Sequence, residues 1–419
     1  MRFPTLLLVV AGVCAPWLMF AAAPTDPAAE VARMRPALVE TRRWFHQHAE
    51  LSNREIETSR EIARRLTALG YPVQTGVAHT GVVATLQGAQ PGPLLAWRAD
   101  IDALPVEEKS ALPYASLNKG VMHACGHDVH ITVGLGAAEV LMKRRKDVRG
   151  TIRFIFQPAE EGAPPGEEGG AALMVKEGVL QPPPRAIFGL HVMPQVPVGS
   201  VAVRAGPVLA AADRFSIKVR GKKAHGAMPH LGVDAVYVGA QLVDALQSRV
   251  SRRQDARQPL VISVGQFHAG NRFNILADEA TLEGTVRTLD PATHAVIKAD
   301  LEGLVHGVCQ AHGASCELTY ANLAPVTVND PTLTARGTAA LTRALGADHV
   351  KEWTPAMVAE DFAFFAQQVP GLYFILGVGA PGVKDPAGIH TPDFQVDEDA
   401  LVTGVNAAVS LLLSEGAAR

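Results

Sequence analysis

Short apolar runs, separated by stretches of helical periodicity, are the feature that most restricts the fold of this chain. Four runs stand out: PLLAWRADID at 93–102, TIRFIFQPAEE at 151–161, AIFGLHV at 186–192 and LYFILGVG at 372–379. Continuous apolar runs of this length are typical of parallel strands that are buried on both faces. Strands that alternate with helices build an α/β fold. We therefore expect a mostly parallel sheet covered by helices.

Charged and metal-binding side chains stand where these runs end. Asp100 and Asp102 follow the first run, Glu160 and Glu161 follow the second, and His191 closes the third. In open α/β sheets, ligands bind beyond the carboxyl ends of the strands. We therefore expect these side chains to converge on one crevice.

The middle of the chain, from about 213 to 320, has a different order of elements. Apolar periodicity predicts a strand, a helix, two strands, a helix and a strand, at 214–221, 234–250, 259–270, 279–289, 292–313 and 314–321. This β-α-β-β-α-β order is that of ferredoxin-like domains. Helix and strand patterns resume afterwards. We therefore expect an inserted α+β domain at 207–322, which interrupts a catalytic domain made of 28–206 and 323–419.

Residues 1–23 have the layout of a cleavable secretory signal. Arg2 precedes a short apolar run, and small residues follow at 21–23. A membrane anchor is the alternative, although Pro16 interrupts the run. We expect a secreted or periplasmic protein with no membrane contact after cleavage. The formal net charge of -3, with both signs spread along the chain, also argues against nucleic acid as a partner.

Export makes the cysteines informative, because disulfides form in oxidising compartments. Removal of the signal takes away Cys14 and leaves Cys125, Cys309 and Cys316. The last two flank a short turn, and they either pair with each other or stay as buried thiols. Cys125 is then left over, and an unpaired thiol among histidines is a candidate metal ligand.

The stretch GVMHACGHDVHITVGLG concentrates ligand-type side chains before a predicted helix. Residues two apart in an extended segment face the same way, so Cys125 and His127 can point at one ion. Thiolate and imidazole suit Zn²⁺ or another late divalent metal. The alternative is a plain helix start that Asp128 caps. We favour the metal site, with His123 and His130 as further candidates for binding the ion or supporting its ligands.

The motif QPAEEG supplies paired carboxylates. Adjacent side chains diverge, so one glutamate can bind an ion while the other takes a proton from the attacking water. The alternative is a solvated acidic loop, and we assign that state to Glu167 and Glu168 in PPGEEGG. Position directly after a buried strand favours function for Glu160 and Glu161.

Two further histidines, His191 and His390 in GIHTPDF, bring the ligand-type residues to a set that we expect to gather: Cys125, His127, Glu161, His191 and His390. Five ligands exceed what one tetrahedral Zn²⁺ takes. They suit two ions roughly 3.5–4 Å apart that share a ligand, and Cys125 is the candidate for that bridge.

Seven motifs resemble, in this order, the amidohydrolase branch of the aminoacylase and carboxypeptidase G metallopeptidase family: RADIDALP, MHACGHDVH, FQPAEEG, GLHV, KKAHGAMPHLGVDA, AEDFAFF and GIHTPDF. That branch includes hippurate hydrolases, N-acyl-L-amino-acid amidohydrolases and plant hydrolases of indole-acetyl amino acids. The resemblance covers nearly the whole chain after the signal. It implies a cofactor of two divalent metal ions, for which Zn, Mn, Co and Ni are all compatible with mixed ligands.

The resemblance also implies roles for individual residues. Glu160 is the general base, and Asp100 supports the ligands from beside them. In other branches of the family an Asp replaces Cys125 as the bridge, and a His occupies the region of Arg98. The implied metal ligands are Cys125, His127, Glu161, His191 and His390.

In the inserted domain, the resemblance implies a lid that also forms a homodimer. His225 matches the histidine that reaches the neighbouring subunit's site and stabilises the developing oxyanion. Asn274 and Arg287 match positions that contact the amide and the carboxylate of the substrate. A guanidinium suits a carboxylate because it binds both oxygens at once.

We therefore expect an enzyme that hydrolyses the amide bond of a small-molecule substrate, an N-acyl-L-amino acid, to a carboxylic acid and a free amino acid. The nearer alternative is a dipeptidase or carboxypeptidase on the same scaffold, since a dipeptide differs mainly in its free amine. The more distant alternative is a metal-dependent binding protein without catalysis. The presence of Glu160 beside a full ligand set argues against that last alternative.

Overall fold

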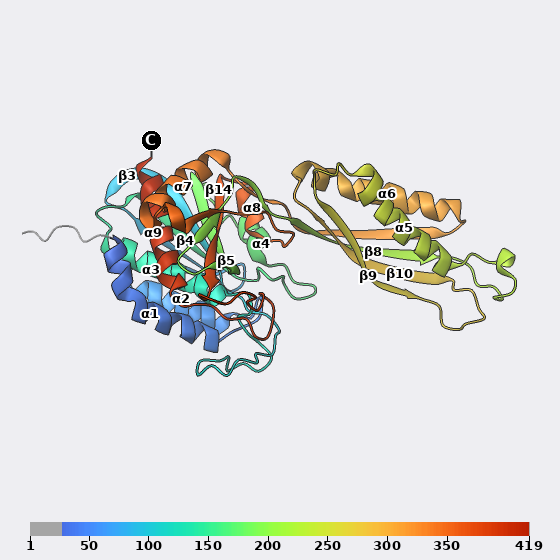
Figure 1. Ribbon diagram of the computed structural model, residues 1–419, viewed down its shortest axis with the longest axis horizontal. Coiled ribbons are helices and arrows are strands. Elements are labelled where there is room, and N and C mark those ends of the chain that lie inside the picture. Colours follow the sequence, from blue (N-terminus) through green and yellow to red (C-terminus); the bar gives the residue numbers. More distant parts are fainter. Residues whose placement is uncertain (1–26, 419) are drawn as a thin grey trace, which may run out of the picture.

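The computed structural model describes residues 27–418, and the chain forms two lobes (Figure 1). The larger lobe holds an eight-stranded sheet with helices packed on it, and the smaller lobe holds a four-stranded sheet with two helices. This architecture confirms the expected fold class. The predicted signal at 1–23 lies outside the described residues.

The large sheet is parallel in its centre, and an antiparallel pairing flanks this centre on each side, β2 with β4 and β6 with β14. Its strand order is β1-β2-β4-β3-β5-β14-β6-β13, and β4, β3, β5 and β14 run parallel to one another. The strands are β1 Val73–Val77, β2 Gly81–Gln87, β3 Gln90–Asp100, β4 Arg149–Gln157, β5 Ala186–Pro197, β6 Val201–Val203, β13 Val350–Glu352 and β14 Gly371–Gly379.

One expectation about β5 is wrong. This strand does not close at His191 but continues to Pro197, because β14 pairs with it along this length. His191 still lies level with the end of β3, since Trp97 of β3 pairs with Phe188 of β5. The side chains of β3 and β5 therefore reach the same edge of the sheet, as the crevice requires.

Alternation along β3 divides the apolar core between the two faces of the sheet. Leu95 and Trp97 belong to the larger cluster, whereas Ala96 belongs to the smaller cluster with Phe362. Burial on both faces explains why the apolar runs are continuous. The larger cluster lies under α1 Pro27–Gln47, α2 Ile56–Ala68, α3 His127–Lys143, α7 Pro331–Leu345 and α9 Ala400–Ala417, and the smaller under α4 Gly170–Lys176 and α8 Phe362–Ala366.

Helix α9 is, in the described part of the chain, the one helix long and apolar enough to cross a bilayer. It contacts α1, α3 and α7, and its Leu401, Val405 and Leu412 side chains are buried in the larger cluster. Its apolar composition therefore matches its place at the centre of the larger lobe.

The smaller lobe, which we call the lid, has the predicted order β8-α5-β9-β10-α6-β11. Asp234 and Asp290 cap the two helices, each accepting hydrogen bonds from two backbone N–H groups of the first turn. A disulfide joins Cys309 to Cys316, which decides between the two states left open above. The elements are β8 Ala211–Arg220, α5 Ala235–Arg253, β9 Leu260–Ala269, β10 Glu279–Thr288, α6 Pro291–Ala311 and β11 Ser315–Ala324.

The lid sheet has a near end and a far end relative to the larger lobe. The chain enters and leaves the lid beside the antiparallel pair β7 Gly206–Leu209 and β12 Thr327–Asn329. At the near end Ala212 of β8 pairs with Arg287 of β10, and at the far end Arg220 pairs with Glu279. At about 3.3 Å per residue, the whole of β8, Ala211–Arg220, spans roughly 30 Å between these two ends.

Candidate metal centre and active site

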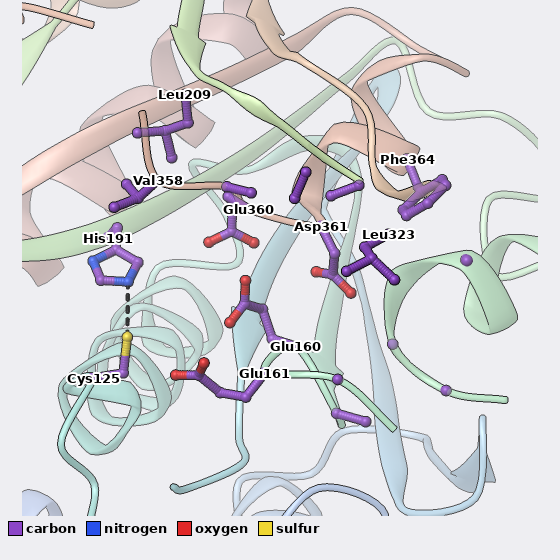
Figure 2. A pocket seen from close by; sticks show the side chains of 18 of the residues that line it. Cys125, Glu160, Glu161, His191, Leu209, Leu323, Val358, Glu360, Asp361 and Phe364 are labelled. Atoms are coloured by element: carbon purple, nitrogen blue, oxygen red, sulfur yellow. Dashed lines mark hydrogen bonds between the residues drawn. The ribbon is translucent and has the colours of Figure 1, made fainter. Parts of the chain in front are cut away.

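A cavity of about 900 Å³ lies between the carboxyl ends of the central strands and the near end of the lid. Figure 2 shows Cys125, Glu160 and Glu161 below Glu360 and Asp361, with His191 above Cys125. The predicted residues that line it are Cys125, Glu160, Glu161, His191, Arg287 and His390. The expected crevice therefore exists, and it collects side chains from distant parts of the sequence.

The five predicted ligand residues form two groups of three that share one sulfur. Cys125, His127 and His191 make the first group, and Cys125, Glu161 and His390 make the second. The Cys125 Sγ atom lies 3.2 Å from Nε2 of His191 and 3.2 Å from Nε2 of His390. Glu161 Oε1 lies 3.3 Å from Nε2 of His390. A shared sulfur between two ligand groups is the arrangement that a bridged pair of ions needs.

Unusual backbone conformations hold these side chains in place. Gly126 has a φ of 85°, and a Cβ atom there would lie 2.4 Å from the Val192 side chain, so only glycine fits between the first two ligands. Ala159 and His390 also have positive φ values, of 54° and 65°. Non-glycine residues in this region are strained, and such strain clusters at functional sites.

The ligand-type imidazoles present their Nε2 atoms to the sulfur and the carboxylates. His127 Nδ1 donates to the backbone oxygen of Asp102 at 2.8 Å, and His191 Nδ1 donates to the backbone oxygen of Val192 at 2.6 Å. A proton held at Nδ1 leaves Nε2 as the free lone pair. Nε2 of His127 is buried and has no hydrogen-bond partner within residues 27–418. That orphaned atom fits the role of a metal ligand.

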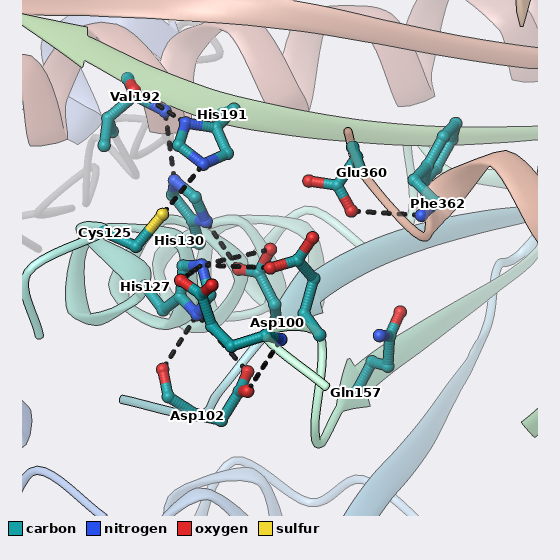
Figure 3. Close-up of polar contacts among 12 residues, drawn as sticks. Asp100, Asp102, Cys125, His127, His130, Gln157, His191, Val192, Glu360 and Phe362 are labelled. Atoms are coloured by element: carbon teal, nitrogen blue, oxygen red, sulfur yellow. Dashed lines mark hydrogen bonds and ion pairs between the residues drawn. The ribbon is translucent and has the colours of Figure 1, made fainter. Parts of the chain in front are cut away.

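Asp100 lies beside the ligands and ties them to their surroundings (Figure 3). Its Oδ1 accepts from His130 Nδ1 at 2.5 Å, and its Oδ2 lies 2.6 Å from Arg98 Nη1 and 3.8 Å from His127 Nε2. His130 Nε2 in turn accepts from the Val192 N–H at 3.1 Å. Both nitrogens of His130 are therefore used, so it supports the ligands and is not one of them.

Asp102, which was expected at the crevice without a specific role, holds ligand residues in place. Besides accepting from His127 through its backbone oxygen, it accepts through Oδ2 from the backbone N–H of Glu161 at 3.0 Å and from the Ser52 hydroxyl at 2.7 Å. It thus holds one member of each ligand group. Its place two residues after Asp100, on the same side of the strand end, is the signal that could have identified it.

Glu160 stands in a cluster of carboxyl groups. One of its oxygens lies within 4.8 Å of an oxygen of Glu360 and an oxygen of Asp361, and Oε2 lies 3.8 Å from His127 Nε2. Burial and the carboxylates of Glu360 and Glu161 raise the pKa of Glu160 well above its ordinary value. A carboxyl group of this kind can take a proton and hold it until it is passed on.

The donor set fits divalent cations. Burial, with the carboxylates of Glu161 and Glu160, raises the pKa of Cys125 well above its ordinary value. Burial opposes a charge on His127, but Asp100 and other carboxylates outweigh it and raise its pKa to about 10. Protons on sulfur and imidazole thus balance the surplus negative charge, and a divalent cation would displace them. Thiolate, imidazole and carboxylate together suit late divalent metals.

The three predicted lid residues lie at opposite ends of the lid. Arg287 lines the cavity from the near end, half-buried, and forms no ion pair with any residue of the described range. His225 and Asn274 lie in the far-end loops, where the Gly226 N–H donates to the Asn274 backbone oxygen at 2.9 Å (Figure 1). About 30 Å of β8 separates them from the cavity. The structure therefore does not bring these two residues to the site of their own chain.

The other candidates weighed from the sequence stand outside both ligand groups. His123 is buried, and neither ring nitrogen has a hydrogen-bond partner among the residues that the structure describes. Glu167 lies 2.5 Å from Arg54, and Glu168 lies 2.7 Å from Lys176. These two glutamates form ion pairs with surface cations, as side chains of a solvated loop do.

Comparison with known proteins agrees with this site. Residues 96–414 match the peptidase family M20/M25/M40. Thermostable carboxypeptidase 2 of Saccharolobus solfataricus is 39% identical over 92% of this chain and 96% of its own length. An N-acetylcysteine deacetylase of Bacillus subtilis is 38% identical over 87% and 93%, respectively. An N-acyl-L-amino acid amidohydrolase of Geobacillus stearothermophilus is 42% identical over 69% and 77%.

A solved structure from Bacillus subtilis, described as a dinuclear metal binding peptidase of the M20 family, is also similar. It is 34% identical, and the match covers 91% of this chain and 98% of that chain with a TM-score of 0.79. The match to the family spans more than half of the sequence and includes all five ligand-type residues. The chain therefore belongs to peptidase family M20/M25/M40, and it is a metal-dependent hydrolase of amide bonds.

Proposed function

We propose that this hydrolase acts on N-acyl-L-amino acids and releases a carboxylic acid and a free amino acid. The observation that carries the proposal is the Cys125 sulfur shared by two ligand groups, with the Glu160 carboxylate 3.8 Å from His127. The names of two relatives, an N-acyl-L-amino acid amidohydrolase and an N-acetylcysteine deacetylase, support the same substrate class.

Recognition of the substrate carboxylate falls to Arg287. Its guanidinium reaches the cavity without an ion-pair partner in the described range, and burial lowers its pKa. A carboxylate that binds there can accept two parallel hydrogen bonds from the guanidinium, which replace the water that burial has removed from Arg287. The amide of the substrate, which one carbon atom separates from that carboxylate, then points towards the two groups of ligand residues.

The protein residues supply proton transfer and positioning. Two divalent ions, when bound by the two groups, would supply Lewis acidity towards the carbonyl and the attacking water. Glu160 takes the proton of that water and later donates it to the nitrogen of the leaving amine. The neighbouring Glu360 carboxylate stabilises the protonated form of Glu160 between these two steps, because like charges repel.

A substitution of Glu160 tests the proposal. The variant Glu160→Ala should keep its metal content and lose about 10²–10⁴-fold in kcat on an N-acyl-L-amino acid. The variant Glu168→Ala, which removes an exposed carboxylate of the neighbouring loop, is the matched control and should retain activity. A Glu160→Ala variant that kept most of its turnover would exclude this residue as the base.

Substrate class and metal are tested together. N-acetyl, N-benzoyl and dipeptide substrates should be assayed side by side, with metal analysis of protein purified from its native compartment. We expect N-acyl-L-amino acids to be preferred and the bound metal to be Zn, Mn, Co or Ni. Faster hydrolysis of dipeptides would instead favour a peptidase, as the carboxypeptidase name of one relative suggests.

We further propose a homodimer in which His225 and Asn274 serve the site of the partner subunit. Their position about 30 Å from their own cavity supports this assignment. Mixing His225→Ala with Glu160→Ala subunits should restore on the order of a quarter of the wild-type activity, because half of the dimers then carry one complete site. Mixtures that stay inactive, although subunits exchange, would contradict it.

The proposed location is the periplasm or the exterior, after removal of residues 1–23. The support is the order of a basic residue, an apolar run and small residues at the start of the sequence. N-terminal sequencing of the protein recovered from its native compartment tests this proposal. A mature protein that still begins at Met1 would contradict it.

A further inference from the structure

The cavity wall beside the ligand residues is apolar. Met193, Leu209, Val358 and Ile389 line the same cavity as the ligand groups, and we call these four residues the apolar wall. Figure 2 shows Leu209 and Val358 on the side of His191, away from Glu161. The metal-dependent chemistry assigned above uses none of these four side chains.

The wall is built into the fold next to the ligands. Met193 follows His191 by two residues on β5, so both side chains face the same side of the strand. Ile389 directly precedes His390. The Ala210 N–H donates to the backbone oxygen of Val358 at 2.9 Å, which fixes this residue beside the end of β7.

Exposure differs along the wall, since Met193 and Leu209 pack in apolar clusters of their own chain whereas Val358 is open to solvent. Val358 is 42% exposed although it lines a concave surface, whereas Leu209 behind it is 1% exposed. Ligand sites are typically clefts in which apolar walls carry a few polar groups. The polar groups of this cavity include the ligand cluster, Glu360, Asp361 and Arg287, and Val358 is the exposed member of the wall that can contact an apolar part of the substrate.

Geometry decides which part of the substrate this is. In an N-acyl amino acid only the α-carbon and the amide nitrogen separate the carboxylate from the reacting carbonyl, so with the carboxylate on Arg287 the amino-acid half lies between Arg287 and the ligands. The acyl chain is bonded directly to the reacting carbonyl. It therefore extends from the ligand cluster, where Met193 and Ile389 flank His191 and His390.

We propose that the apolar wall is the acyl-binding subsite and that the preferred substrates carry an unbranched apolar acyl chain longer than acetyl. This inference rests on the proposed function, since it assigns a part of that substrate. The cavity of about 900 Å³ accommodates such a chain. Each methylene that leaves water for the wall should raise kcat/KM about fourfold.

A chain-length series tests the inference on the metal-loaded full-length enzyme. The substrates are N-acetyl-, N-butanoyl-, N-hexanoyl- and N-octanoyl-L-alanine, and the measured quantity is kcat/KM. From acetyl to hexanoyl we expect a rise on the order of a hundredfold. A hexanoyl-to-acetyl ratio below about fivefold would overturn the inference. A matching rise along N-acetyl-L-alanine, -L-methionine and -L-leucine, with none along the acyl series, would also overturn it.

Variants assign the effect to the wall. Val358→Ser should lower the hexanoyl-to-acetyl ratio severalfold, and Val358→Ala should lower it less. Leu117→Ser removes another exposed apolar side chain, 69% exposed and outside the cavity lining, and should leave the ratio unchanged. An unchanged ratio in both Val358 variants would overturn the inference. Absence of hydrolysis across the whole series would instead overturn the proposed function, and the inference with it.

Discussion

Removal of the Arg98 guanidinium should destabilise the larger lobe more than any exposed charge substitution. Arg98 is fully buried, and it lies 2.6 Å from Asp100, 2.9 Å from Glu360 and 2.8 Å from Asp361. Its Nε also donates to Gln157 at 2.7 Å. Arg98→Met keeps the length of the side chain but leaves three buried carboxylates without their cation.

The expected cost follows from this arrangement. Breaking one buried ion pair by removing a partner costs about 3–5 kcal/mol, and Arg98 serves three carboxylates, so we expect about 5 kcal/mol. Burial and Glu360 already raise the pKa of Asp361 to about 7 in the presence of Arg98. Without the cation these carboxyl groups bind more protons in the folded state than in the unfolded state. Stability of the variant should therefore fall as pH rises from 5 to 8.

Urea unfolding followed by tryptophan fluorescence measures this cost. The lid, from β8 to β11, contains no tryptophan, and Trp97 is buried next to Arg98, so the signal reports on the larger lobe. Asp361→Asn in the Arg98→Met background should recover about 1–3 kcal/mol rather than add a further loss. Arg257→Met, which removes an exposed cation paired with Asp255, is the control and should not change the unfolding midpoint. A cost below about 1 kcal/mol for Arg98→Met, or additive losses in the double variant, would refute the reasoning.

Three further outcomes are expected. Chelation of bound metal should abolish amide hydrolysis and lower the thermal midpoint, and added Zn or Mn should restore both; activity that survives complete removal of metal would contradict the assignment. Burial opposes ionisation of Glu108, but hydrogen bonds from His46 and Ser110 outweigh it and lower the pKa of Glu108 to about 2. Glu108→Gln should therefore cost about 1–3 kcal/mol of unfolding free energy near pH 6. This difference from wild type should shrink as pH falls from 4.5 towards 2. Cys316→Ser opens the link to Cys309, seven residues away, and should cost the lid about 2–3 kcal/mol in calorimetry, a difference that a reducing agent should remove.

Most of the fold could be predicted because the burial of each strand and helix determines the pattern of apolar residues within that segment. The runs of β3, β4 and β14 are continuously apolar because helices cover both faces of their sheet. Lid strands such as β11 instead alternate between more and less buried residues, because one face of the lid sheet is open to solvent. The extension of β5 beyond His191 was missed, because it depends on pairing with β14, nearly two hundred residues further along the chain. The sequence of β5 alone carries no signal for that partner.

The gathered ligands could be predicted for a different reason. Cys125, His127 and Glu161 occur in dense motifs whose chemistry is unusual for packing, so composition alone marks them. Composition does not single out Arg98 and Asp361 in this way, because a single charged residue in a sequence is most often exposed to solvent. Their ion pair joins positions 263 residues apart, and only the folded chain shows that it is buried beside Glu160.

His225 and Asn274 lie in loops at the far end of the lid, away from the cavity of their own chain. The pairing of β8 with β10 is continuous over ten residues, so the lid sheet cannot bend its far end back to the cavity without breaking that ladder. Each lost backbone hydrogen bond in the lid core would cost free energy without any compensating contact. The far-end loops can therefore act on substrate in a second copy, or not at all. Phe273 beside Asn274 is 96% exposed, an arrangement that a subunit contact would explain. Subunit mixing separates these possibilities, because it restores activity only if the far end of one chain completes the cavity of another.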